Sequence, residues 1–223
     1  MKNFALIETI LWENSTFFLL ALHLERLKKS AQCFSFPYDE SLILQKINDS
    51  ADVFEKTKKY RVRLVLEKSG KMTIQYQMLE KPPAGPAKAV ISKHRINAAN
   101  IFLYHKTTNR ALYNKELKKY RAKGLFEVIF LNQDGQITEG AISNIVIKKN
   151  QELWTPPVLC GLLNGTFRQY LLSGVVEARI FAPLQIKEKI FYKEDLLNAD
   201  AVFMINSVRK ILPITLFSSF KSV

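Results

Sequence analysis

Residues 81–86, Lys-Pro-Pro-Ala-Gly-Pro, constrain the fold more than any other segment of this 223-residue chain. Proline has no backbone N–H and a fixed φ, so neither a regular helix nor a strand ladder continues through this segment. A chain of this length with 48% apolar residues can bury one large core or two smaller ones. We therefore expect two lobes, residues 1–92 and residues 93–223, with a last strand of the first lobe at 87–92.

The spacing of apolar residues predicts a mixture of helices and strands. Alternation predicts paired strands at 60–67 and 72–79, separated by the turn residues Ser69-Gly70. Apolar residues recur at helical spacing from Leu20 to Ala31, and a second long helix is expected from Ala111 to Lys123. The other expected elements are a hairpin at the start, a helix capped by Asp39, strands at 126–131, 136–139, 145–148 and 201–205, and helices at 166–172 and 193–197. The fold class is therefore α+β.

A net charge of +13 favours an anionic partner of some kind. Seven Lys or Arg residues and one Glu lie between Lys106 and Lys123, which is a pattern that nucleic-acid-binding domains also show. The aromatic and glycine patterns of common RNA modules are missing, so a solvated basic face is the preferred interpretation and a nucleic-acid partner is not expected. A positive field also suits an enzyme whose cofactor and substrate are both anionic.

Several features argue against a membrane, secreted or metal-dependent protein. The apolar run Phe17 to Leu22 is too short to span a bilayer, and no secretion signal is recognisable, so we expect a cytoplasmic protein without a membrane partner. Cys33 and Cys160 have neither metal-ligand spacing nor the density of a disulfide framework. His23 and His94 are not spaced for metal binding, so no metal site is expected.

Four short motifs carry the chemical signal. They are residues 23–27 (HLERL), 105–110 (HKTTNR), 138–145 (TEGAISNI) and 163–168 (LNGTFR). In order and approximate spacing they match the class IV aminotransferases, the fold-type IV enzymes that use pyridoxal 5'-phosphate (PLP). The chain resembles this family along nearly its whole length.

The resemblance implies a two-lobed fold, like that of D-amino-acid aminotransferases, with PLP at the interface of the lobes. It implies that Lys106 bonds to the cofactor and transfers protons, and that Glu139 pairs with the pyridine nitrogen. The other implied cofactor contacts are Arg26, Leu163, Gly165, Thr166, Phe167 and Ser207, and the implied substrate contacts are Asn144 and Arg209.

The residue types suit these roles. A lysine amine attacks an aldehyde when desolvation or nearby cations keep it partly unprotonated. A carboxylate keeps a ring nitrogen protonated, so that the ring can accept electrons. A guanidinium and the start of a helix supply charge and hydrogen-bond donors to a phosphate. Each residue also has a simpler interpretation: Lys106, Arg26 and Arg209 as solvated charges, Glu139 as an exposed strand-end carboxylate, Ser207 as a cap, and Asn144 as a partner of loop backbone.

Within the family, HKTT followed by Arg110 is most similar to the aminodeoxychorismate lyases, including lyase domains fused to aminodeoxychorismate synthase. Branched-chain enzymes have a tyrosine five residues after the lysine, where this chain has Ala111, and Tyr113 is an alternative residue for that region. The resemblance implies conversion of 4-amino-4-deoxychorismate to 4-aminobenzoate and pyruvate, in folate biosynthesis. Two alternatives stay open: an amino-acid transaminase of the D-amino-acid or branched-chain type, and a basic nucleic-acid-binding protein with a degraded PLP site.

The resemblance also implies partners. We expect a small-molecule amine substrate, a homodimer, and aminodeoxychorismate synthase as a functional partner. The chain begins close to the first family segment, here Ile7-Glu8-Thr9, and lacks the preceding D-R-x-x-x-G-D-G stretch of many free-standing members. Part of the usual dimer surface is therefore expected to be missing or rebuilt.

Overall fold

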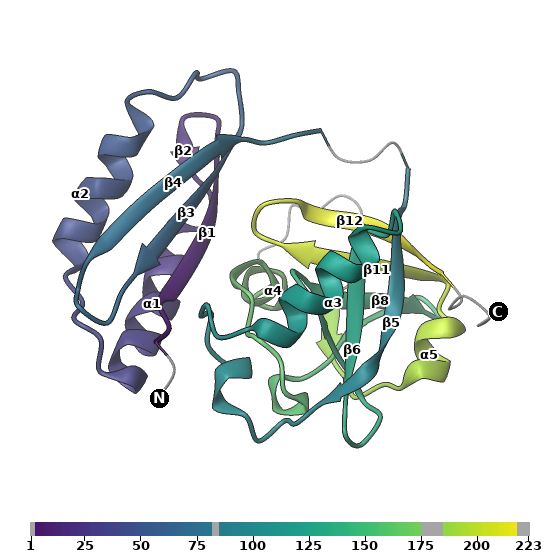
Figure 1. Ribbon diagram of the computed structural model, residues 1–223. Helices are drawn as coiled ribbons and strands as arrows, with labels where there is room; N and C mark the ends of the chain where they lie inside the picture. The colour runs from purple at the N-terminus through teal and green to yellow at the C-terminus, as the bar shows by residue number, and fades with distance from the viewer. Residues whose placement is uncertain (1–2, 82–84, 175–184, 218–223) are drawn as a thin grey trace. The chain divides into compact units, whose positions relative to one another are not determined.

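The computed structural model describes residues 3–81, 85–174 and 185–217, and the chain forms two compact units. Unit 1 comprises Met1–Pro82 and His105–Asn109, and unit 2 comprises Pro83–Tyr104 and Arg110–Val223 (Figure 1). Residues 82–84 of the expected break lie outside the described part of the chain. The units do not divide at residue 92, because the strand β5 (Ala87–Ile96) is paired with strands of unit 2.

Unit 1 is an antiparallel four-stranded sheet with two helices. The strands lie in the order β2-β1-β3-β4, and the expected hairpin, the expected paired strands and both expected helices are confirmed. Asp39 caps the second helix, since its side chain accepts a hydrogen bond from Leu42 N at 3.0 Å. The elements are β1 (Leu6–Glu13), β2 (Thr16–Phe17), α1 (Leu20–Phe34), α2 (Glu40–Ala51), β3 (Tyr60–Leu66) and β4 (Met72–Met78).

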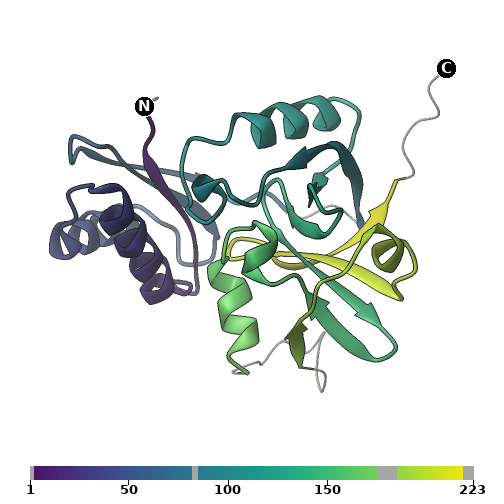
Figure 2. The same ribbon diagram turned by 90° about the horizontal axis from the view of Figure 1, so that it is seen from below.

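The core of unit 1 lies between the sheet and the two helices, which cover the same face of the sheet (Figure 2). Leu24 and Leu27 of α1 and Ile43 of α2 pack against Leu6 and Ile10 of β1. Each fully buried Leu or Ile side chain contributes about 1.5–3 kcal/mol, so this apolar stripe fixes α1, and with it Arg26, against β1.

A short extended segment, His105–Asn109, joins β1 in unit 1. Leu6 pairs with Thr107, Ile7 N donates to Lys106 O at 3.0 Å, and Thr108 N donates to Ala5 O at 2.9 Å. The lobe boundary expected after residue 92 puts Lys106 in the second lobe. The backbone pairing instead makes Lys106 part of unit 1.

Unit 2 is built on an eight-stranded mixed sheet in the order β10-β9-β8-β11-β12-β5-β6-β7. An additional pairing of β7 with β8 connects the sheet back on itself, so that six strands close into a barrel. The strands, besides β5, are β6 (Glu127–Asn132), β7 (Ile137–Gly140), β8 (Asn144–Lys149), β9 (Glu152–Thr155), β10 (Ile186–Glu188), β11 (Ala201–Asn206) and β12 (Lys210–Leu216).

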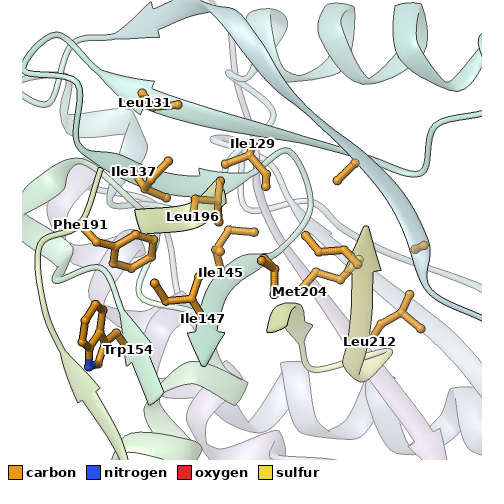
Figure 3. Close-up of a cluster of buried hydrophobic side chains, with 14 residues drawn as sticks. Ile129, Leu131, Ile137, Ile145, Ile147, Trp154, Phe191, Leu196, Met204 and Leu212 are labelled. Carbon is orange, nitrogen blue, oxygen red and sulfur yellow. The ribbon is translucent and has the colours of Figure 1, made fainter. Parts of the chain in front are cut away.

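The interior of the barrel is filled with apolar side chains. Figure 3 shows Ile129 and Ile137 pointing toward Ile145, with Met204 and Leu212 from the strands that follow. These residues alternate along their strands with residues of the other face, as expected for strands with two different faces. The barrel therefore gives a rigid base for the turns at its ends.

Helices surround the barrel of unit 2. The helix α3 packs Tyr113, Leu117 and Tyr120 against Val128 and Phe130 of β6. The helical segments are η1 (Ile101–Leu103), α3 (Ala111–Arg121), η2 (Val158–Cys160), α4 (Thr166–Leu172) and α5 (Lys193–Leu197). None of the helices in the described ranges is long and apolar enough to cross a membrane. Both cysteines are free; Cys160 is buried and Cys33 is exposed.

Candidate active site

The expected site residues fall into two groups, one in each unit. Unit 1 carries Arg26 and Lys106, and unit 2 carries the others. Each group is held by contacts within its own unit.

Lys106 is held by contacts on both sides of its own peptide. Its carbonyl accepts from Ile7 N, and Ala5 N donates to Thr108 Oγ1 at 2.9 Å. The preceding residue, His105, shares a hydrogen bond between Nδ1 and Ser30 Oγ at 2.9 Å. Lys106 is half-buried, and its neighbours fix its backbone against β1 and α1. The motif residues around Lys106 therefore also fix the backbone of this segment within unit 1.

A buried carboxylate that the sequence analysis did not assign, Glu8, orients Arg26. Glu8 lies between Leu6 and Ile10 on the face of β1 that packs against α1, and it is 2% exposed. Its two oxygens accept from Arg26 Nε at 2.9 Å and Arg26 Nη2 at 2.5 Å, so the pair is bidentate. The side chain of Arg26 is 11% exposed. The solvated-arginine interpretation of Arg26 is therefore wrong.

His23 completes this cluster. Its side chain is fully buried, and its Nδ1 lies 2.6 Å from Glu8 Oε2. Burial alone raises the pKa of Glu8, but the charges of Arg26 and His23 and their hydrogen bonds lower the pKa to about 2. Because Glu8 is then ionised and accepts only, His23 Nδ1 carries the proton of this bond. No role for His23 is expected from the sequence alone, although its place one helical turn before Arg26 indicates that the two side chains share a face of α1.

Lys106 belongs to the same neighbourhood. Burial lowers the pKa of His23, Glu8 opposes this, and the positive charges of Arg26 and Lys106 lower the pKa further. Lys106 therefore lies within electrostatic reach of His23, which contacts Glu8 directly. Unit 1 thus carries Lys106 and an oriented Arg26 within one group of interacting charges.

In unit 2, Glu139 and Asn144 hold the peptide of Leu163 from two sides. Leu163 N donates to Glu139 Oε2 at 3.2 Å, and Asn144 Nδ2 donates to Leu163 O at 2.8 Å. Glu139 and Asn144 are themselves cross-strand partners at the ends of β7 and β8. Glu139 is only 9% exposed, so the interpretation as an exposed carboxylate is wrong. Asn144 binds loop backbone, as its simpler interpretation expects.

The position of Asn144 also explains why residue 165 is a glycine. A Cβ atom at this position would overlap Asn144 Oδ1, so no larger residue fits while Asn144 binds Leu163. Gly165 is the N-cap of α4, and Thr166 and Phe167, both buried, form its first turn. The family resemblance implies Gly165 as a cofactor contact, and in the structure the neighbouring side chain of Asn144 already requires a glycine at this position.

Arg168 fixes the start of α4 and was not singled out from the sequence. It is 2% exposed and donates to Asn164 Oδ1 and to Pro156 O, both at 2.9 Å, and it pairs with Glu188. A buried guanidinium with three partners holds the 163–166 turn in place.

Ser207 and Arg209 lie in the turn that joins β11 to β12. Asn206 Oδ1 accepts from Val208 N at 3.0 Å and from Arg209 N at 2.7 Å, which closes the turn. Asn206 Nδ2 donates to Ile142 O at 3.2 Å, so this turn is tied to the β7–β8 turn that follows Glu139. Ser207 is buried and Arg209 is half-buried.

Tyr113 is the alternative residue for the region that a tyrosine occupies in branched-chain enzymes. It lies on α3 and is buried against Phe130, with ring centroids 4.4 Å apart. Burial, and then the nearby carboxylate of Glu139, raise the pKa of Tyr113 well above its ordinary value. Tyr113 therefore reaches the neighbourhood of Glu139 from a different helical position, and Ala111 is an exposed residue at the start of α3.

The side chains present fit PLP. Its aldehyde needs an amine, its ring nitrogen needs a carboxylate, and its phosphate needs a guanidinium and helix-start amides. Lys106 carries such an amine and Arg26 such a guanidinium, and the low exposure of Glu139 suits a carboxylate that pairs with a ring nitrogen. Among the described residues no group of three His, Cys, Asp or Glu side chains could hold a metal ion.

The fold is that of the α+β enzymes of fold type IV, a class of enzymes that depend on PLP. The chain belongs to the class IV aminotransferase family, whose family model matches residues 5–217.

Relatives within this family include both lyases and transaminases. The chain is 29% identical over 215 residues to a "Putative aminodeoxychorismate lyase" of Schizosaccharomyces pombe, a match that covers 95% of this chain and 89% of the relative. It is 36% identical over 105 residues to the D-alanine aminotransferase of Bacillus licheniformis, covering 47% of this chain and 35% of that enzyme. Among solved structures, a "Putative amino-acid aminotransferase" from Mesorhizobium loti has a TM-score of 0.86 and 31% identity, covering 96% of this chain and 100% of the other.

Proposed function

We propose that this protein is a PLP-dependent 4-amino-4-deoxychorismate lyase that forms 4-aminobenzoate and pyruvate, a step of folate biosynthesis. The observation that carries the proposal is the similarity to the S. pombe protein, which extends over 95% of the chain. The HKTT segment followed by Arg110 supports the same choice.

The proposed reaction removes the proton from the amine-bearing carbon and breaks the C–O bond on the neighbouring ring carbon. The enolpyruvate that leaves takes up a proton and becomes pyruvate. The amine nitrogen stays in the aromatic product, so atoms balance without a second substrate. PLP, when bound, supplies a ring that stabilises the negative charge left at the amine-bearing carbon.

The chain's own residues would bind the cofactor and move the proton. Lys106 would hold the cofactor aldehyde and, when released by the substrate amine, take the proton from the amine-bearing carbon. Its fixed backbone limits the volume in which its amine moves, which favours transfer at one carbon. Glu139 would keep the ring nitrogen protonated, and Arg26, oriented by Glu8, would bind the phosphate together with Thr166 and Phe167.

Product analysis tests the lyase proposal. Purified protein with PLP is given 4-amino-4-deoxychorismate, and separately D-alanine or leucine with 2-oxoglutarate. We expect 4-aminobenzoate and pyruvate in equal amounts from the first mixture. Amino-group transfer in the second mixture without 4-aminobenzoate in the first would contradict the lyase.

Trapping with borohydride tests the role of Lys106 separately. The reduced protein should carry the cofactor mass on the peptide that contains Lys106. Lys106→Ala should not trap the cofactor. The control is Lys115→Ala, which replaces an exposed lysine of the same basic stretch and should trap the cofactor as the wild-type protein does. A colourless protein without an adduct would contradict both the lyase and the transaminase.

A class IV amino-acid transaminase is the second candidate. The match to D-alanine aminotransferase favours it, although that match covers less than half of this chain. A transaminase retains the amine nitrogen for a second substrate, so the product analysis above separates the two functions.

We also propose that the protein is a cytoplasmic homodimer that receives its substrate from an aminodeoxychorismate synthase. Membership of the family supports the dimer, and the chemistry of the proposed substrate supports the synthase as its source. Light scattering should give twice the mass of one chain; the mass of a single chain at assay concentrations would overturn the dimer.

A further inference from the structure

Glu127, the first residue of β6, is a buried carboxylate for which the proposed reaction has no use. Its side chain is 0% exposed and points into the same barrel interior as Ile129, two residues later. A carboxylate in an apolar interior is less favourable than an apolar side chain of similar size unless its oxygens are fully paired. The position of Glu127 therefore requires an explanation.

The partners of Glu127 lie mainly on the turn between β7 and β8. Ser143 Oγ donates to Glu127 Oε2 at 2.7 Å, Ile142 N donates to the same oxygen at 3.3 Å, and Val128 N donates to Oε1 at 2.9 Å. All of these groups are donors, which suits an acceptor with two oxygens. Glu127 thus binds the turn from inside the barrel.

The backbone of the turn is shaped around this carboxylate. A Cβ atom at residue 140 would lie 2.7 Å from Glu127 Oε2, so Gly140 permits the turn to close over Glu127. Two further side chains bind the turn through its carbonyls: Arg110 donates to Ala141 O, and Asn206 Nδ2 donates to Ile142 O at 3.2 Å. The turn is therefore fixed by side chains from three different elements.

The residues on either side of this turn are Glu139 and Asn144. They are cross-strand partners, and together they hold the peptide of Leu163. A shift of the turn would move the end of β7, and with it the carboxylate of Glu139, relative to Leu163. The geometry of Glu139 consequently depends on what holds residues 140–143.

We propose that Glu127 is a positioning residue, which fixes the β7–β8 turn through Ser143 and Ile142 and thereby sets the place of the Glu139 carboxylate toward the ring nitrogen of bound PLP. The proposal rests on the proposed function, because it needs a bound cofactor. Glu127 itself touches neither cofactor nor substrate.

The test is a pH titration of the visible absorption of the protein loaded with PLP. Glu127→Gln keeps the size of the side chain but replaces one acceptor oxygen with a donor that faces N–H or O–H groups. We expect the midpoint of its titration to move in the same direction as in Glu139→Gln, by a smaller amount. We also expect kcat to fall by about 10- to 100-fold with a smaller change in KM, as for displacement of a catalytic group.

Glu116→Gln is the matched control. Glu116 is a buried carboxylate of the same unit, 1% exposed, and it accepts from Ser92 Oγ at 3.0 Å without contacting the turn. Its titration midpoint should equal that of the unchanged protein. If Glu116→Gln and Glu127→Gln shift the midpoint equally, Glu127 has no special role and the proposal is overturned.

A second variant covers the case in which Glu127→Gln does not fold. Ser143→Ala removes the shortest contact and leaves the carboxylate in place. Its midpoint should shift as in Glu127→Gln, by less, and an unchanged midpoint would overturn the proposal. Failure of the unchanged protein to form a borohydride adduct on Lys106 would instead overturn the proposed function, so the two failures are distinguishable.

Discussion

Replacing Glu8 with glutamine should weaken unit 1 and change how its stability depends on pH. The carboxylate is buried and makes a bidentate pair with Arg26 and a hydrogen bond with His23. The glutamine side chain would keep the shape of the original one but lose the charge that these two partners face. The change therefore isolates the electrostatic part of the cluster.

The magnitude follows from the pKa of Glu8. Its lowering from an ordinary 4.5 to about 2 corresponds to about 3 kcal/mol of folding free energy, at about 1.4 kcal/mol per pH unit. Because the folded pKa is the lower one, this contribution is complete above pH 4.5 and is lost as the pH falls toward 2. At pH 3, between the two pKa values, about half of this contribution remains. Glu8 opposes the lowering of the His23 pKa by burial, so the difference between the two proteins at low pH also contains a contribution from His23.

Urea unfolding of the two proteins without cofactor, followed by circular dichroism, measures this difference. At pH 7 the free energy of unfolding of Glu8→Gln should be about 3 kcal/mol lower than that of the wild-type protein. At pH 3 this difference should be about half as large. The control is Glu40→Gln, because Glu40 is half exposed and pairs with Lys28 at 3.4 Å. Exposed pairs contribute about 0–1 kcal/mol. Equal losses in the two variants, or a gap that does not depend on pH, would refute the reasoning.

Three further predictions concern residues around the proposed cofactor site. Glu139→Gln should lower kcat by about 100-fold while PLP occupancy, measured by absorbance, changes little; equal rates at matched occupancy would contradict its role. Gly165→Ala should lower the free energy of unfolding by about 1–3 kcal/mol, because the new methyl overlaps Asn144 Oδ1; an unchanged Tm would show that the turn adapts freely. Ser30→Ala should lower the free energy of unfolding by about 0.5–1.5 kcal/mol, because the hydrogen bond to His105 is lost. It should also slow borohydride trapping at Lys106; trapping at the normal rate would show that this hydrogen bond does not help to position Lys106.

The local elements of both units could be predicted from the sequence because their signals are local. The apolar stripe from Leu20 to Ala31 predicts α1, and the alternation at 60–67 and 72–79 predicts β3 and β4 within one residue at each end. The hairpin expected at the start of the chain is confirmed, and its turn residues Asn14 and Ser15 adopt positive φ angles, 52° and 62°. Such turns favour small polar residues, which makes them visible in a single sequence.

The assignment of segments to units could not be predicted in the same way. β5 pairs in parallel with β6 across the intervening helix α3, and no residue in 87–92 specifies that partner. His105–Asn109 joins a strand about 100 residues earlier through backbone hydrogen bonds, which any residue type can make. Both boundaries depend on contacts between distant segments, whereas the spacing of apolar residues reports only on local structure.

The residues that the sequence analysis missed at the candidate site are mainly buried charges. Glu8 and Glu127 look like ordinary acidic residues by type, but each occupies the alternating position of buried apolar neighbours: Leu6 and Ile10 for the first, Ile129 and Leu131 for the second. An acidic residue in that register faces the core, and there it persists only with partners that fill both oxygens. In unit 1 the partners include Arg26, and in unit 2 they include the turn after Glu139. An acidic residue at a core-facing position of a strand therefore indicates a buried carboxylate that binds and positions a nearby motif residue. Such a position can be recognised in the amino-acid sequence alone.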